Sequence, residues 1–161
     1  DGLGGTGQRG LWKTIGGNAM IYLLDLNYTL VGNSPKRGDP PIRPFIRQIE
    51  QETYRRWLVE LLRPHQVILI TARPDRYREV TLDRIEEQTG WRPMDACFAL
   101  INSRPHMIKE HLLTTCVFPR YGEEGSGYFG LESNPHTRAM YTRHGIQSIR
   151  VTNQELWMLP R

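Results

Sequence analysis

The chain has 161 residues, the usual length of one domain, and its 39% hydrophobic content can build one core but not two. No apolar run approaches the roughly 20 residues that a membrane span needs, and no signal peptide is visible, so we expect a cytoplasmic protein without a membrane partner. The net charge of +4 is a mild bias towards polyanionic partners and favours phosphate-bearing substrates as a class. Binding of duplex DNA is not indicated, because the chain contains no continuous Lys/Arg block.

Residues 1–19 differ from the rest of the chain, because they are rich in glycine and lack hydrophobic periodicity. This composition predicts a flexible linker, a tail, or residues foreign to the native protein. Met20 directly precedes the first predicted strand and is a candidate native start. We therefore assign one domain to residues 20–161 and expect that an upstream domain of a larger protein could precede it.

After Met20, short apolar strands alternate with helical segments. The predicted strands are buried apolar runs at residues 21–24, 67–70, 97–101, 128–131 and 146–151. The predicted helices have helical spacing of apolar residues, or Pro near the start and Gly after the end, at residues 45–62, 74–89, a short stretch after Pro105, and 135–144. This alternation predicts an α/β fold with a central parallel sheet, helices on both faces, and ligands at the carboxyl ends of the strands.

Polar residues stand at those carboxyl ends. Asp25 follows the first strand, Thr71 ends the second, Lys109 lies on the helix after the third, and Glu132 follows the fourth. A carboxylate nucleophile, a hydroxyl, an ammonium group and a second carboxylate are the groups that phosphoryl transfer through an aspartyl-phosphate needs. Two carboxylates and a backbone carbonyl also suit Mg²⁺, which prefers hard oxygen ligands.

The same stretches resemble the haloacid-dehalogenase (HAD) superfamily. LLDLNYTLV is similar to its first motif, ILITARP to the second, RPHMIKEHL to the third and YFGLESNPHTRAMYTRHGI to the fourth, so the resemblance covers about residues 20–151. TARPDRYREVT looks like the polynucleotide-kinase 3′-phosphatase branch. The resemblance implies a three-layer Rossmann-like HAD fold. Because residues 33–41 are too short for a cap domain, we expect little or no cap and an open site.

The resemblance also implies roles for single residues. Asp25 would be the nucleophile, Asn27 would stand at the general acid/base position, Thr71 would grip the phosphoryl group and Lys109 would neutralise charge. The substrate-binding residues would be Thr71, Ala72 and Arg73, and the Mg²⁺ ligands Asp25, Asn27 and Glu132. Each residue has a structural alternative: a turn cap for Asp25, a strand-end backbone bond for Thr71, a solvated lysine for Lys109, support of a helix N-terminus for Glu132, and pairing with a surface acid for Arg73.

Two departures from the family pattern bear on activity. Asn27 replaces the Asp that acts as general acid/base, and Glu132-Ser133 replaces a pair of acids. The first hypothesis is a Mg²⁺-dependent phosphohydrolase acting on a phosphomonoester of a small molecule, a nucleotide or a nucleic-acid end. The alternative is a HAD-fold module that binds phosphate or nucleic acid with little turnover. Because Asn cannot donate a proton, we expect slow turnover that favours aryl phosphates, and a gain for alkyl esters in Asn27→Asp.

The cysteines and histidines carry no metal-type spacing. Cys97 and Cys116 each lie in an apolar context, which predicts buried, reduced thiols. The five histidines show no HxH or HExxH pattern and are expected to be structural or exposed.

Overall fold

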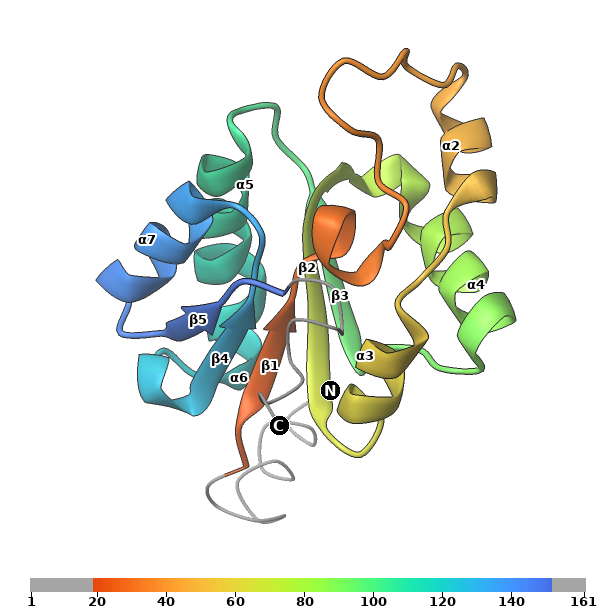
Figure 1. Ribbon diagram of the computed structural model, residues 1–161. Coiled ribbons are helices and arrows are strands. Elements are labelled where there is room, and N and C mark those ends of the chain that lie inside the picture. The colour runs from red at the N-terminus through yellow and green to blue at the C-terminus, as the bar shows by residue number, and fades with distance from the viewer. Residues whose placement is uncertain (1–18, 152–161) are drawn as a thin grey trace, which may run out of the picture.

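The computed structural model describes residues 19–151 (Figure 1). The segment predicted as a linker therefore lies outside the described residues except for residue 19, and so do residues 152–161 of the predicted domain. No helix within residues 19–151 is long and apolar enough to cross a membrane.

Five parallel strands form one sheet in the order β3-β2-β1-β4-β5. The strands are β1 Ile21–Leu24, β2 Gln66–Pro74, β3 Asp95–Ala99, β4 Tyr128–Leu131 and β5 Gln147–Ile149. β1 is the central strand, with Leu24 opposite Leu69 of β2 on one side and opposite Leu131 of β4 on the other. The chain thus leaves β1 towards one edge of the sheet and returns to pair with its other side, which creates a topological switch point between β1 and β4.

Helices cover both faces of the sheet (Figure 1). They are α2 Phe45–Gln51, α3 Arg56–Leu62, α4 Arg78–Thr89, α5 Pro105–Leu112, α6 Phe118–Tyr121 and α7 Pro135–Arg143. Side chains alternate across β1, so that Leu24 packs with the α3 and α4 side while Leu23 packs with the α5, α6 and α7 side. The predicted three-layer Rossmann-like α/β fold with a parallel sheet is confirmed.

The predicted helix over residues 45–62 is wrong, because the chain forms two helices there. Glu52 leaves the helical conformation (φ −64°, ψ 136°), and Tyr54 forms an antiparallel bridge with Val31. The backbone oxygen of Glu52 accepts a hydrogen bond from Gln88 Nε2 at 2.7 Å, so α4 supplies a partner that replaces the helical one. Apolar spacing alone does not reveal the break, because Ile49 before it and Leu58 after it are both buried, as in a continuous helix.

The prediction of reduced thiols is also wrong. Cys97 of β3 and Cys116, on the wide helical turn Leu113–Val117 after α5, form a disulfide. Their Cα atoms are 6.5 Å apart, within the range that a disulfide spans. The apolar context was read correctly for Cys97, which is buried, but it carries no signal of the neighbouring thiol 19 residues away.

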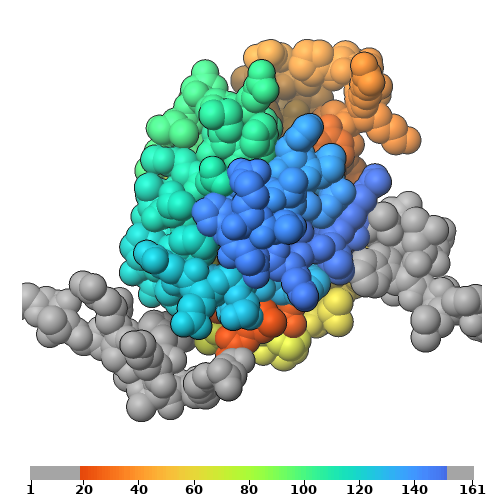
Figure 2. All heavy atoms as spheres, turned by 90° about the vertical axis from the view of Figure 1, so that its left-hand side faces the viewer, coloured from red at the N-terminus to blue at the C-terminus, as the bar shows by residue number. Residues whose placement is uncertain are grey.

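The segment between β1 and α2 projects near the carboxyl ends of the strands (Figure 1 and Figure 2, orange). Residues 32–44 contain no helix or strand and fold back on their neighbours. The Asn33 side chain bonds Gln51 O and the Thr53 N–H at 2.8 Å each, and the Tyr28 hydroxyl donates to Pro35 O. A loop of this size is too small to form a cap domain.

Candidate functional site

The sheet register brings Asp25 and Glu132 together. Leu24 pairs with Leu131, and Asp25 N–H donates to Leu131 O at 2.9 Å, so the two acids follow adjacent strands at the same edge. This edge is the switch point between β1 and β4, where ligands bind in open α/β sheets. Both carboxylates are nevertheless buried, with relative exposures of 5% for Asp25 and 1% for Glu132.

Lys109 lies between these two carboxylates. Its Nζ donates to Asp25 Oδ1 at 2.6 Å and to Glu132 Oε2 at 2.5 Å. Lys109 comes from α5, whose amphipathic pattern buries Ile108 and Leu112 against the sheet and carries the lysine with them. The structure thus joins three of the predicted site residues in one buried cluster, which we call the Asp25–Lys109–Glu132 cluster.

Two hydroxyl groups hold the other oxygen of Asp25. Thr29 Oγ1 donates to Asp25 Oδ2 at 2.7 Å and Ser133 Oγ donates to the same atom at 2.9 Å. Thr29 is fully buried on the wide turn Leu26–Leu30, where Tyr28 takes a positive φ of 62° to let the chain reverse. Neither residue was assigned a role from the sequence. The first motif nevertheless includes Thr29, and Ser133 is the residue that departs from the paired acids of the family.

The cluster holds two acids and one base, which sets its electrostatics. Burial disfavours a charged Lys109, but Asp25 and Glu132 outweigh this effect and raise the pKa of Lys109. Burial raises the pKa of Glu132 to about 7, the Lys109 charge opposes that rise and the Asp25 charge adds to it. When both acids are ionised, this buried cluster carries one net negative charge, which would favour a cation beside it.

Thr71 and Ala72 follow Leu69 and Ile70 on β2, next to β1. Thr71 is buried, and its hydroxyl accepts a hydrogen bond from Arg73 N–H at 3.1 Å, while Ala72 is half-buried. The backbone bond is the structural alternative that the sequence left open for Thr71. A grip on a phosphoryl group by these two residues stays a prediction.

Arg73 pairs with an acid, as the structural alternative predicts, but this acid is buried and does not lie on the surface. Its Nη1 and Nη2 donate to the Glu52 carboxylate at 2.9 and 2.5 Å, and the two side chains are 0% and 4% exposed. Nη1 also donates to Thr81 Oγ1 at 2.9 Å, and Nη2 to Asn27 Oδ1 at 3.2 Å. The guanidinium is enclosed by protein and contacts the site edge through Asn27, so binding of substrate by Arg73 stays a prediction. Glu52 was missed, because it lies inside a segment that reads as a continuous helix.

The donor chemistry of this edge fits Mg²⁺. The Asn27 carbonyl oxygen lies 3.4 Å from Ser133 Oγ, which itself contacts Asp25 Oδ2, so the carbonyl and the carboxylate converge on Ser133. Within residues 19–151, no group of three or more His, Cys, Asp and Glu side chains could hold a metal. Mg²⁺ commonly takes only one or two carboxylates and fills its shell with water, so Asp25, Asn27 and Glu132 suffice as a candidate set.

A hollow of about 560 Å³ lies elsewhere, over α5 and α7. Its wall includes Glu110, Arg143 and His144, and Glu110 binds both of the others at 3.0 Å. The ion pair of Glu110 with Arg143 and its hydrogen bond with His144 account for these polar side chains. The buried charges lie at Asp25 and not in this hollow.

Comparisons with known proteins bear on the fold. No protein-family model matches the chain, and no curated protein matches it in sequence. Among solved structures, a chain in "Structure of Pnkp1/Rnl/Hen1 complex" is similar, with a TM-score of 0.63 and 18% identity. The similarity covers 83% of this chain and 46% of that one, so the present chain spans about half of the matched protein. At this identity the match shows a shared fold.

Proposed function

We propose that the protein is a HAD-type, Mg²⁺-dependent phosphohydrolase that cleaves a phosphomonoester through an aspartyl-phosphate on Asp25. The observation that carries the proposal is the Asp25 carboxylate itself: buried at the switch point, bonded on one oxygen to Lys109 and on the other to Thr29 and Ser133. A structural carboxylate does not require a second buried acid on the same lysine, whereas a site for an anionic substrate and a cation benefits from it.

In the first step, an Asp25 oxygen attacks the phosphorus atom, and the bond from phosphorus to the ester oxygen breaks. Lys109 holds the attacking carboxylate in place and offsets negative charge, and the Thr29 and Ser133 hydroxyls fix its orientation. Asp25, Glu132 and the Asn27 carbonyl would hold Mg²⁺, which when bound would neutralise negative charge on the phosphoryl group. The leaving oxygen takes its proton from water, because the Asn27 amide has no acidic proton to transfer.

In the second step, water attacks the aspartyl-phosphate at phosphorus. The new oxygen–phosphorus bond forms as the bond to Asp25 breaks, which releases inorganic phosphate and restores the carboxylate. Asn27 cannot take the proton of this water, so the intermediate is expected to persist longer than in an enzyme with an acid/base Asp. A long-lived intermediate gives the proposal a direct signature.

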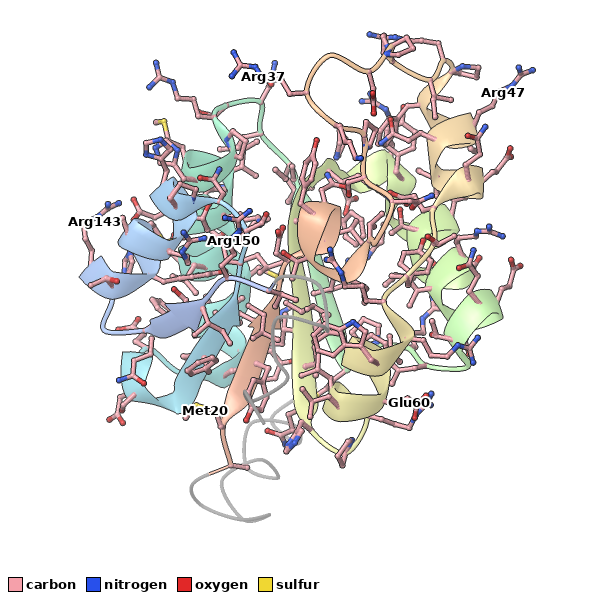
Figure 3. All side chains as sticks on the ribbon, viewed as in Figure 1. Met20, Arg37, Arg47, Glu60, Arg143 and Arg150 are labelled. Carbon is pink, nitrogen blue, oxygen red and sulfur yellow. A yellow bond between two sulfur atoms is a disulfide. The ribbon has the colours of Figure 1, made fainter. Side chains whose placement is uncertain are left out.

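A nucleic-acid end is the substrate class that the surroundings favour. The site has no cap domain, and exposed Arg37 and Arg47 lie on the side of the sheet where the strands end, opposite Met20 and Glu60 (Figure 3). Cationic side chains around an open edge attract a polyanion whose terminal phosphate reaches Asp25. The fold shared with a chain of the Pnkp1/Rnl/Hen1 complex fits the resemblance to polynucleotide-kinase phosphatases.

The test is phosphate release from four substrates: an aryl phosphate, a nucleoside monophosphate, and oligonucleotides phosphorylated at the 3′ or the 5′ end. We expect release that requires Mg²⁺, and a hydroxylamine-labile phosphate on the wild-type protein that is missing in Asp25→Asn. Arg37→Gln with Arg47→Gln should lower kcat/KM for the oligonucleotides and leave the aryl phosphate unchanged. Absence of labelling and of turnover on every substrate would refute the hydrolase.

A phosphate-binding module is the second candidate, and the Asn27 contact favours it. The Asn27 amide oxygen bonds Arg73, so neither end of this side chain can act as an acid or a base. Such a module would bind a phosphorylated oligonucleotide tightly enough for calorimetry and release no phosphate over hours. Binding without labelling of Asp25 distinguishes it from a slow enzyme.

A further inference from the structure

Asn27 has a defined orientation, which Arg73 sets. Arg73 Nη2 lies 3.2 Å from the Asn27 side-chain oxygen. A guanidinium has donors and no acceptors, so the amide atom that faces it must be the oxygen. The amide nitrogen is then the free end, and the side chain is only half-buried. Asn27 therefore presents an N–H donor, and the orientation follows from chemistry alone.

The Arg73 side chain cannot easily turn away from this contact. Glu52 binds both of its terminal nitrogens, Thr81 accepts a further bond, and the Phe45 ring lies 5.2 Å from the guanidinium carbon. Arg73 and Glu52 are 0% and 4% exposed, so solvent does not compete for them. A bidentate pair in this environment is a rigid support.

The residue that carries this amide stands at the edge of the site. Asn27 follows Asp25 by two residues, and its backbone carbonyl lies 3.4 Å from Ser133 Oγ, the group that also bonds Asp25 Oδ2. Ser133 thus ties the Asn27 backbone and the Asp25 side chain to one point.

We propose that the buried Glu52–Arg73 pair is a positioning device that fixes Asn27 as a neutral hydrogen-bond donor to the oxygens of the bound phosphate ester. This inference rests on the proposed function and adds a residue role to it. Asn27 then contacts the substrate directly, whereas Arg73 and Glu52 position Asn27 and do not touch the substrate.

An Asp at position 27 would not restore a general acid in this setting. Its carboxylate would lie beside the Arg73 guanidinium, which favours the ionised form. The free oxygen would then face the anionic substrate and repel it. The inference therefore reverses the expectation from the sequence, in which Asn27→Asp raises hydrolysis of alkyl phosphates.

The first experiment measures the Kd of inorganic phosphate by calorimetry, and kcat/KM for one aryl and one alkyl phosphate, in wild type, Asn27→Ala and Asn27→Asp. We expect phosphate binding to weaken by about 10-fold or more in Asn27→Ala, as for loss of a hydrogen bond to a charged group. It should weaken at least as much in Asn27→Asp, with both esters slowed alike. A tenfold gain for the alkyl ester in Asn27→Asp, or unchanged phosphate binding in Asn27→Ala, would overturn the inference.

The second experiment tests the positioning role with Arg73→Lys, alone and combined with Asn27→Ala. A lysine cannot reach Glu52 with two nitrogens and Asn27 as well, so phosphate binding should weaken, and the double variant should bind no worse than Asn27→Ala. Arg78→Lys, whose guanidinium bonds the Ala96 carbonyl, is the matched control and should bind phosphate normally. Additive losses in the double variant would remove Arg73 from the positioning role.

The two proposals fail in different ways. A wild-type protein that neither binds phosphate nor hydrolyses any ester refutes the proposed function and this inference together. If the wild type binds phosphate or hydrolyses a phosphate ester, and Asn27→Ala does so equally well, the inference alone is refuted. If Arg73→Lys does not fold, the variants of Asn27, which is only half-buried, still test whether this residue donates to the phosphate.

Discussion

Two buried ion-pair networks flank the end of β1, and they differ in charge balance. The Asp25–Lys109–Glu132 cluster combines two acids with one base, while the Glu52–Arg73 pair combines one acid with one base and also bonds Thr81 and Asn27. With both acids ionised, the first network has an excess of negative charge, which a bound cation would balance. The second is balanced in charge, and its further hydrogen bonds fix Thr81 and Asn27. Burial of charge alone therefore does not distinguish the two networks, whereas their charge balance does.

The largest expected effect is the loss of the Asp25 nucleophile. Asp25→Asn keeps the shape of the side chain and removes its charge, so turnover of an aryl phosphate should fall by about 10⁴-fold, or roughly 5 kcal/mol of barrier. Asp95→Asn is the control, since Asp95 bonds Arg120 and Tyr121 away from the cluster. Retention of more than a tenth of wild-type turnover would place the nucleophile elsewhere.

The neutral pair should matter more for stability. Glu52→Ala leaves the Arg73 charge buried without its acid and should lower the free energy of unfolding by about 3–5 kcal/mol. Glu132→Gln leaves Lys109 paired with Asp25 and should cost less. Urea denaturation of both variants checks the difference, and an equal loss in the two would erase the distinction between the networks.

The hydroxyls on Asp25 should contribute less than the charges. Ser133→Ala removes a 2.9 Å bond to the carboxylate and should slow turnover by about 10- to 100-fold, as loss of a hydrogen bond to a charged group does. Steady-state kinetics on the aryl phosphate measures it. Ser103→Ala, outside the cluster, should behave as wild type, and the assignment fails if Ser133→Ala does so too.

The smallest predicted effect is stabilisation by the metal. Mg²⁺ at ten times its Kd should add about 1.4 kcal/mol to the free energy of unfolding of the wild type, since it binds the folded state alone. The gain should vanish in Glu132→Gln and persist in Glu52→Gln. Equal gains in all three proteins would show that the metal does not use the unbalanced cluster.

The sequence predicted one of these networks and missed the other for a physical reason. Asp25, Lys109 and Glu132 stand at or after strand ends, and parallel topology forces such positions to one edge of the sheet. Glu52 and Arg73 are 21 residues apart. Glu52 falls in a predicted helix and Arg73 follows a predicted strand, so the spacing of residues within either element does not place the two in contact. The disulfide was missed in the same way, because pairing across elements leaves no trace in the spacing of either one.

Burial also could not be read from residue type. A lysine and two acids are normally solvated, and only the packing of α5 against the sheet shows that these three are not. Likewise, the sequence shows that position 27 is Asn, but the direction of its amide depends on Arg73, which the fold supplies.

The central position of β1 has a consequence for how the chain acquires its structure. Asp25 meets Lys109 across 84 residues and Ser133 across 108, so the cluster closes only after most of the domain has been synthesised. Before β4 arrives, β1 offers an apolar strand with one unpaired edge. Such edges recruit other chains, so a truncated product that ends within residues 100–125 and lacks β4 is expected to aggregate.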